Sequence, residues 1–150
     1  GVNHGSVNMD LLITNEGNVH IVDVGARMGG NLIGSHIIPI GTGIDYMGNM
    51  IRAAVGDETD WKPTCEPRPV ATKLLALAPG KIKNLPDFAQ IAEENNVQIE
   101  HHLHIGDLIT PYRTNLDGCG YVIASDLDVY LSIAQAAEVR SLIDKSIERE

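Results

Sequence analysis

Residues 5–31 read GSVNMDLLITNEGNVHIVDVGARMGGN, and this stretch decides the fold of the first part of the chain. Two runs rich in apolar residues, 7–14 and 19–24, flank the turn-forming sequence Asn15-Glu16-Gly17-Asn18. Apolar runs joined by a few residues that include Asn and Gly are typical of a β-hairpin. We therefore predict two antiparallel strands at residues 7–14 and 19–24.

One acidic residue falls in each predicted strand, Asp10 in the first and Asp23 in the second. The turn between the strands can bring both side chains onto one face. Carboxylate oxygens are preferred ligands of Mg²⁺, which commonly shares its coordination shell with substrate phosphates. Aspartate is also disfavoured within an apolar strand, so a purely structural role fits these positions poorly. The alternative is that both carboxylates point to solvent from an exposed sheet face.

Arg27 follows shortly after Asp23 and has Gly25, Gly29 and Gly30 around it. The planar guanidinium of arginine matches phosphate oxygens, and neighbouring glycines allow main-chain N–H groups to approach the same anion. The alternative is a surface arginine paired with an acid. Residues 25–43 are interrupted by glycines and show no clear period, which predicts a loop that can approach a ligand closely.

Residues 5–31 resemble the C-terminal subdomain of ATP-grasp ligases, where two metal-binding acids on neighbouring strands precede an arginine and often a Gly-Gly pair. Residues 41–57, GTGIDYMGNMIRAAVGD, are similar to the segment that leads out of the grasp domain in that family. Residues 70–124 resemble the small C-terminal lobe of amino-acid ligases and of phosphoribosylglycinamide-synthetase-like members. The chain as a whole is similar to the C-terminal portion of an ATP-grasp ligase of the L-amino-acid ligase, phosphoribosylglycinamide synthetase or carbamoyl-phosphate synthase large-subunit type. The resemblance implies an α/β (α+β) chain: the C-terminal half of an ATP-grasp domain, an antiparallel sheet plus helices, followed by a small mixed α+β lobe.

The resemblance also implies roles for individual residues. Asp10 and Asp23 take the places of the two metal ligands, and Arg27 takes the place of the catalytic arginine that contacts phosphate. The implied cofactors are ATP and Mg²⁺. The residues implied to bind the nucleotide are Arg27, Gly29, Gly30 and Asn31.

Two features depart from the family pattern. Aspartates replace the usual glutamates, and Gly25 stands where many members have an asparagine that completes the metal shell.

The implied reaction is the ADP-forming ligation of a carboxylate to an amine through an acyl phosphate, on an amino-acid-type substrate. The alternative is a non-catalytic ATP-grasp-derived binding or assembly module, which the two departures favour and the retained acids and Arg27 oppose.

The chain is expected to form two parts. Residues 1–60 are the C-terminal part of the grasp subdomain, residues 61–69 are a proline-rich linker, and residues 70–150 are the small α+β lobe. A helix is expected from residue 44 to a terminator at Gly56. In the lobe we predict strands at 70–77, 97–105 and 120–124, with a turn at Pro79-Gly80. We also predict a short helix that begins at Pro86 and Asp87, and a long helix that begins at a Ser125–Asp128 capping box. One side of the long helix is expected to be buried, and it consists of Val129, Ile133, Ala136, Ala137, Leu142, Ile143 and Ile147.

His101, His102 and His104 form a second cluster of functional interest. Strand alternation would place His102 and His104 on one face and His101 on the other, so two at most could share a metal. We favour a solvated strand over a zinc site, which would need further ligands from distant residues.

Composition and charge limit the expected partners. The chain has 150 residues, 43% of them apolar, and a formal net charge of −9. Such a chain is poorly suited to nucleic acid, and no apolar run approaches the length of a membrane span. The two cysteines have no disulfide or zinc spacing, which favours the cytoplasm.

We interpret the chain, which begins at Gly1, as a fragment that lacks its N-terminal ATP-grasp subdomain and is inactive by itself. We expect the fragment to form a homodimer. We expect the complete protein to act on small-molecule carboxylate and amine substrates.

Overall fold

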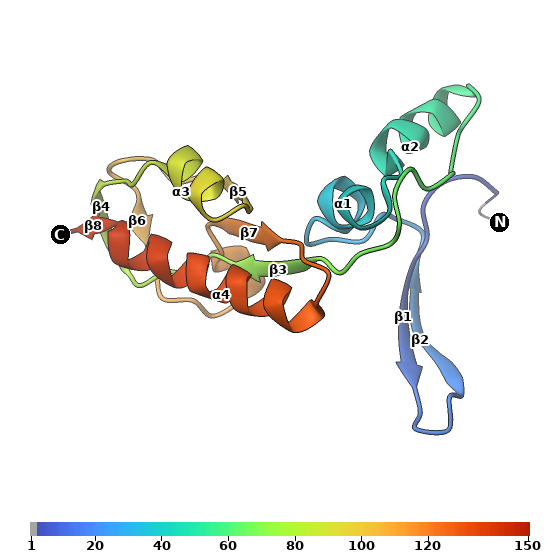
Figure 1. The fold of residues 1–150 in the computed structure, drawn as a ribbon, viewed down its shortest axis with the longest axis horizontal. Helices are drawn as coiled ribbons and strands as arrows, with labels where there is room; N and C mark the ends of the chain where they lie inside the picture. Colours follow the sequence, from blue (N-terminus) through green and yellow to red (C-terminus); the bar gives the residue numbers. More distant parts are fainter. Residues whose placement is uncertain (1–2) are drawn as a thin grey trace. The chain divides into compact units, whose positions relative to one another are not determined.

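The chain forms two compact units in a computed structural model that describes residues 3–150 (Figure 1). The first unit ends at Pro67 and the second spans Arg68–Glu150. Helices and antiparallel sheets alternate along the described chain, so the predicted α/β (α+β) class is confirmed.

The first unit begins with a β-hairpin of β1 (Asn8–Ile13) and β2 (Val19–Gly25), drawn in blue in Figure 1. At its turn, the Thr14 N–H donates to the Asn18 carbonyl and the Gly17 N–H donates to the Thr14 carbonyl, both at 2.9 Å. Gly17 has φ 83°, a left-handed conformation that glycine adopts without steric cost. The predicted hairpin is confirmed to within about one residue at each strand end.

Two short helices occupy part of the predicted loop at 25–43. A π-helical turn, η1 (Ile33–Ile37), runs directly into α1 (Ile38–Thr42). The loop prediction is therefore wrong for these residues. Pro39 and Gly41 mask the helical signal in the sequence, yet proline is well tolerated in the first turn, where its missing N–H has no helical partner.

Helix α2 (Tyr46–Val55) ends at the predicted terminator and begins two residues later than predicted. The Asp45 carboxylate accepts a hydrogen bond from the Gly48 N–H at 2.9 Å, which caps the first turn. Gly56 ends the helix with φ 83°. Asn49 is buried and its amide bonds to both backbone groups of Asp60, so the chain after α2 is held against the helix.

The second unit contains two antiparallel three-stranded sheets. The first has the order β3 (Ala71–Leu74), β7 (Gly120–Ala124), β5 (Gln98–His101), and the second has the order β6 (Leu108–Ile109), β4 (Gly80–Asn84), β8 (Glu148–Arg149). Strand β7 matches its prediction, whereas β3 and β5 are shorter than predicted. Strand β4 is not predicted from the sequence, because it holds a single buried residue, Ile82, between two lysines.

Two helices and a 3₁₀ turn, η2 (Asn115–Asp117), complete the second unit. Helix α3 (Phe88–Glu94) follows Asp87, whose carboxylate accepts from the Gln90 N–H at 3.0 Å. Helix α4 (Val129–Ser146) follows Asp128, whose carboxylate accepts from the Tyr130 N–H at 2.7 Å. The predicted capping box is wrong, because Asp128 is itself the cap and the Ser125 hydroxyl donates to the Pro69 carbonyl.

Helix α4 packs along β3 and β7, as Figure 1 shows, and forms the core with them. Its buried face consists of Ser132, Ala136, Val139 and Ile143. Three residues predicted to be buried, Val129, Ile133 and Leu142, are 47%, 53% and 42% exposed. Ser132 is tolerated on the buried face because its hydroxyl donates to the Asp128 carbonyl and accepts from the Asp126 N–H at 2.8 Å.

Candidate functional site

The two predicted metal ligands are brought together by the hairpin. Asp10 on β1 is the direct cross-strand partner of Asp23 on β2. Directly opposed residues in an antiparallel pair point to the same face, with Cβ atoms about 5 Å apart. Both residues are exposed, so the carboxylates are accessible from solvent.

A β-bulge is responsible for this pairing. On the turn side, Leu11 pairs with Ile21, and on the other side Asp10 pairs with Asp23, so Val22 has no partner. Had the register of the turn continued unbroken, Asp10 would pair with Val22, and the two acids would lie on opposite faces. The turn alone therefore does not bring the acids together, because the extra residue in β2 is also needed. Bulges are frequent next to active sites for this reason.

Arg27 lies just beyond the end of β2, and its side chain lies beside Gly25, the last residue of that strand. Its Cγ and Nε atoms are 3.5 and 3.7 Å from the point where a Cβ on Gly25 would lie. The Arg27 N–H donates to the Gly25 carbonyl at 2.9 Å, and one guanidinium nitrogen donates to the Met28 carbonyl at 2.9 Å. The tight turn thus folds the arginine over Gly25, which is two residues from Asp23.

One further residue of this site, Asn8, is not predicted from the sequence. It is the cross-strand partner of Gly25 and occupies the next same-face position to Asp10 on β1. Its Oδ1 lies 2.9 Å from the point where a Cβ on Gly29 would be, so the glycine loop sits directly against the amide. Only the register of the bulged hairpin reveals this neighbourhood.

The loop residues Gly30, Asn31 and Leu32 follow in an unusual backbone conformation. Asn31 has φ 52° and Leu32 has φ 66°, both in the left-handed region. Leucine rarely adopts this conformation, which costs on the order of 1 kcal/mol or more. The Ile33 N–H donates to the Gly30 carbonyl at 3.1 Å, which closes the loop. The loop is thus held in one shape, in which Gly30 has open space where a side chain would be.

The donor set of this site suits a hard divalent cation. It offers two carboxylates and, from Asn8, an amide oxygen, which are the oxygen types that Mg²⁺ takes. Among residues 3–150 no group of three or more His, Cys, Asp or Glu side chains is placed to hold a metal. Mg²⁺ completes its shell with water and substrate phosphates rather than with a full protein cage, so two carboxylates and an amide are sufficient.

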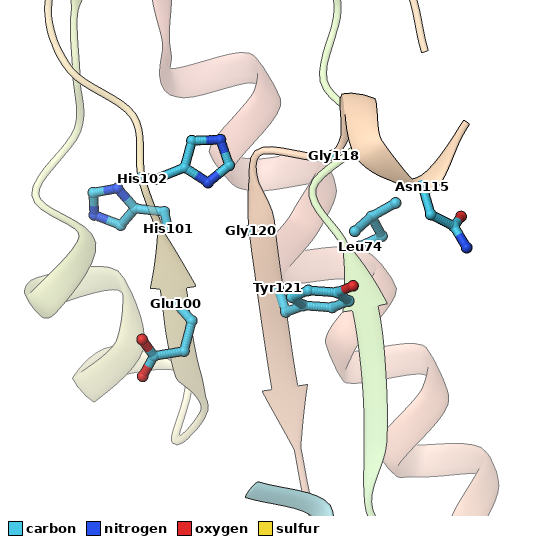
Figure 2. Close-up of a pocket in the computed structure, with 8 residues that line it drawn as sticks. All are labelled: Leu74, Glu100, His101, His102, Asn115, Gly118, Gly120 and Tyr121. Atoms are coloured by element: carbon cyan, nitrogen blue, oxygen red, sulfur yellow. The ribbon is translucent and has the colours of Figure 1, made fainter. Parts of the chain in front are cut away.

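The histidine cluster lies in the second unit, beside an open pocket of about 300 Å³ (Figure 2). Tyr121 of β7 lies at the centre of this pocket, between Leu74 of β3 and Glu100 of β5. His101 ends β5 and stacks on Phe88, with the ring centroids 3.9 Å apart. Burial lowers the pKa of His101 and the neighbouring histidines lower it further. His102 and His104 lie beyond the end of β5, so the strand predicted to reach residue 105 ends before them.

Comparison with solved structures identifies the fold. The chain is similar to phosphoribosylglycinamide synthetase from Anaerococcus prevotii (TM-score 0.71, 17% identity, 96% of this chain and 36% of that chain). It is also similar to L-amino acid ligase from Bacillus licheniformis (TM-score 0.70, 19% identity, 100% and 39%). A third similar structure is the biotin carboxylase domain of Hydrogenobacter thermophilus 2-oxoglutarate carboxylase, a dimer in complex with MgADP, ADP and bicarbonate (TM-score 0.64, 14% identity, 98% and 32%).

The chain therefore has a fold that makes up part of these ATP-grasp structures. The chain spans about a third of the length of the solved structures it matches, between 32% and 39%. No protein-family model matches the sequence, and no curated protein matches it. None of the helices in residues 3–150 is both long and apolar enough to cross a membrane.

Proposed function

We propose that the chain is the C-terminal part of an ATP-dependent, ADP-forming carboxylate–amine ligase that acts on an amino-acid-type substrate. The observation that carries the proposal is the pairing of Asp10 with Asp23 on one hairpin face, beside Arg27 and the glycine loop. The MgADP of the Hydrogenobacter carboxylase domain and the substrate class of the Bacillus ligase support it.

Each residue of the site has a role in this reaction. ATP would activate the carboxylate as an acyl phosphate, which the amine then attacks with release of phosphate, and Mg²⁺ would offset charge on the phosphoryl oxygens. Asp10 and Asp23 hold the cation. Arg27 positions the transferring phosphoryl group and offsets its negative charge, and fixed charges of this kind stabilise a transition state without reorganisation. Gly29, Gly30 and Asn31 shape the loop around the nucleotide.

The rest of the nucleotide cleft belongs to a segment outside this chain. We assign residues 1–60 to the C-terminal part of the grasp subdomain, 61–69 to a linker and 70–150 to the small lobe, with an N-terminal grasp subdomain as partner. The chain by itself is then inactive, because it supplies one side of the cleft. Both cysteines are free thiols, which is compatible with a reducing cytoplasm.

A homodimer is the second assembly that we propose. Apolar side chains project from both faces of the hairpin, and burial of such a surface favours self-association. The exposed residues are Met9, Leu11, Leu12, Ile13, Val19, Ile21, Val22 and Val24. Light scattering of the chain at high concentration should give the mass of a dimer, and a strictly monomeric mass would rule this assembly out.

The test of the catalytic proposal is ATP-dependent phosphate release by the full-length protein with a panel of amino acids. Asp23→Asn should lower turnover about a hundredfold or more, since it removes a charge that holds the cation. Asp57→Asn removes an exposed charge after α2 and should leave turnover unchanged, as should His102→Ala in the second unit. Unchanged turnover in Asp23→Asn would contradict the site, and equal loss in His102→Ala would place the chemistry in the other unit.

The non-catalytic module remains the second candidate, because Asp10, Asp23 and Gly25 all depart from the usual ATP-grasp residues. The same experiment separates the two. A full-length protein that binds MgATP but releases no phosphate with any amine and carboxylate pair would favour the module.

A further inference from the structure

We propose that Asn8 is a third oxygen ligand of the cation held by Asp10 and Asp23, and that Gly29 keeps the Asn8 amide in place. The inference rests on the proposed function, because the cation is the Mg²⁺ of the nucleotide. Asn8 has no counterpart in the motif from which the site was predicted, and its role follows from the hairpin register.

The first step is the position of Asn8. It lies on the same face of β1 as Asp10, one same-face position farther from the turn, and it faces Gly25 across the ladder. Gly25 has no side chain, and the Arg27 side chain covers the point where one would lie, whereas the Asn8 amide oxygen lies against Gly29 of the following loop. Asn8 thus lies on the face of the Asp10–Asp23 pair and opposite the glycine that the arginine covers.

The second step is the chemistry of the amide. Mg²⁺ requires six oxygen ligands, and two short aspartate side chains supply few of them. A neutral carbonyl oxygen adds a ligand without adding a third negative charge to the pair. An amide at residue 8, unlike a carboxylate, also forms no ion pair with the Arg27 guanidinium, so the positive charge of Arg27 remains available to bind phosphate.

The third step is the contact with Gly29. A Cβ on Gly29 would lie 2.9 Å from Asn8 Oδ1 and 2.9 Å from Ile33 Cδ1, closer than non-bonded atoms come. The amide or the isoleucine would have to move. A Cβ on Gly30 would meet nothing within 4 Å. The two glycines therefore differ: the absence of a side chain at Gly29 leaves room for the Asn8 amide, whereas a side chain at Gly30 would not touch it.

The test is Mn²⁺ binding to the nucleotide-free, full-length protein, followed by electron paramagnetic resonance of the free ion. Asn8→Ala should weaken Mn²⁺ binding about tenfold, the loss typical of a group that shapes a metal site. Asn8→Asp should keep the affinity, since it restores an oxygen ligand, while it lowers ATP turnover because the new carboxylate pairs with Arg27. Gly29→Ala should weaken Mn²⁺ binding, and the control Asp57→Asn, which removes an exposed charge after α2, should bind as the unmodified protein does.

The outcomes separate this inference from the proposed function. If Asp23→Asn binds Mn²⁺ normally, the cation site itself is wrong. If Asp23→Asn loses affinity and Asn8→Ala does not, the role of Asn8 is refuted and the cation site stands. If circular dichroism shows that Asn8→Ala does not fold, Gly29→Ala decides: the same Mn²⁺ affinity in Gly29→Ala and in the unmodified protein refutes the inference.

Discussion

Asp10 and Asp23 are direct partners across the β1–β2 ladder because Val22 is left out of the pairing. Two like charges in directly opposed positions destabilise a sheet. The hairpin therefore carries an arrangement that opposes its own folding and that a bound cation would relieve. Local arrangements that lower the stability of the fold are typical of functional sites.

The first prediction follows from this repulsion. Without metal, Asp23→Asn should stabilise the hairpin by roughly 0.2–1 kcal/mol, because it removes one of two opposed charges. Hydrogen exchange of the β1 and β2 amides should slow accordingly. Mg²⁺ should slow exchange in the unmodified chain and have no such effect on the variant. Faster exchange in the metal-free variant would show that the two carboxylates do not repel each other.

Turnover of the full-length protein should depend on the planar shape of the Arg27 side chain as well as on its charge. Arg27→Lys keeps the charge but loses the planar fork that binds two oxygens at once, so it should lower turnover of the full-length protein at least tenfold. Arg27→Ala should lower it further. Arg52→Lys is the control, because Arg52 forms an exposed ion pair with Asp45 at 3.2 Å. Steady-state kinetics at saturating ATP measure all three, and full activity of Arg27→Lys would exclude a two-oxygen contact.

The core of the second unit should depend on α4. Ile143 is 0% exposed, and Ile143→Ala should lower the free energy of unfolding of this unit by about 2–5 kcal/mol through the cavity it creates. Leu131→Ala, on the exposed side of the same helix at 57% exposure, should change it by less than about 1 kcal/mol. Urea unfolding followed by circular dichroism gives both values. Similar losses would mean that α4 uses a different face.

The two cysteines should differ in reactivity. Cys65 is exposed, whereas Cys119 is buried, and burial together with the nearby Asp107 raises the pKa of the Cys119 thiol. The thiolate is the reactive form, so iodoacetamide at neutral pH should modify Cys65 first. Cys119 should react at a comparable rate only in urea. Mass spectrometry of the labelled peptides distinguishes the sites, and equal rates in the native protein would contradict the packing around β7.

Much of the local structure is predictable because the signals are short-range. The hairpin follows from its alternating runs and from the turn at Gly17, and α2 ends at Gly56 as expected. The acids and Arg27 are recognisable as a motif for the same reason. These features depend on neighbours within a few residues, so the sequence contains them directly.

The parts that escape prediction depend on distant partners. The bulge at Val22 determines which residues pair across the two strands, and no residue type in the sequence predicts it. Asn8 can therefore be assigned to the site only after the strand register is known. Strand β4 has one buried residue, Ile82, and exists because β6 and β8 pair with its two edges. The buried side of α4 was misjudged because Ser132, a polar residue, is satisfied internally.

Within residues 3–150, the hydrophobic core consists of residues between Leu75 and Ile147, so it lies in the second unit, while the proposed cation site lies on the hairpin of the first. A two-stranded hairpin is marginally stable by itself in water. Only the fraction of molecules with an ordered hairpin can bind the cation, and the apparent dissociation constant rises as that fraction falls. A neighbouring segment that holds the hairpin in place would therefore tighten metal binding without contributing a single ligand.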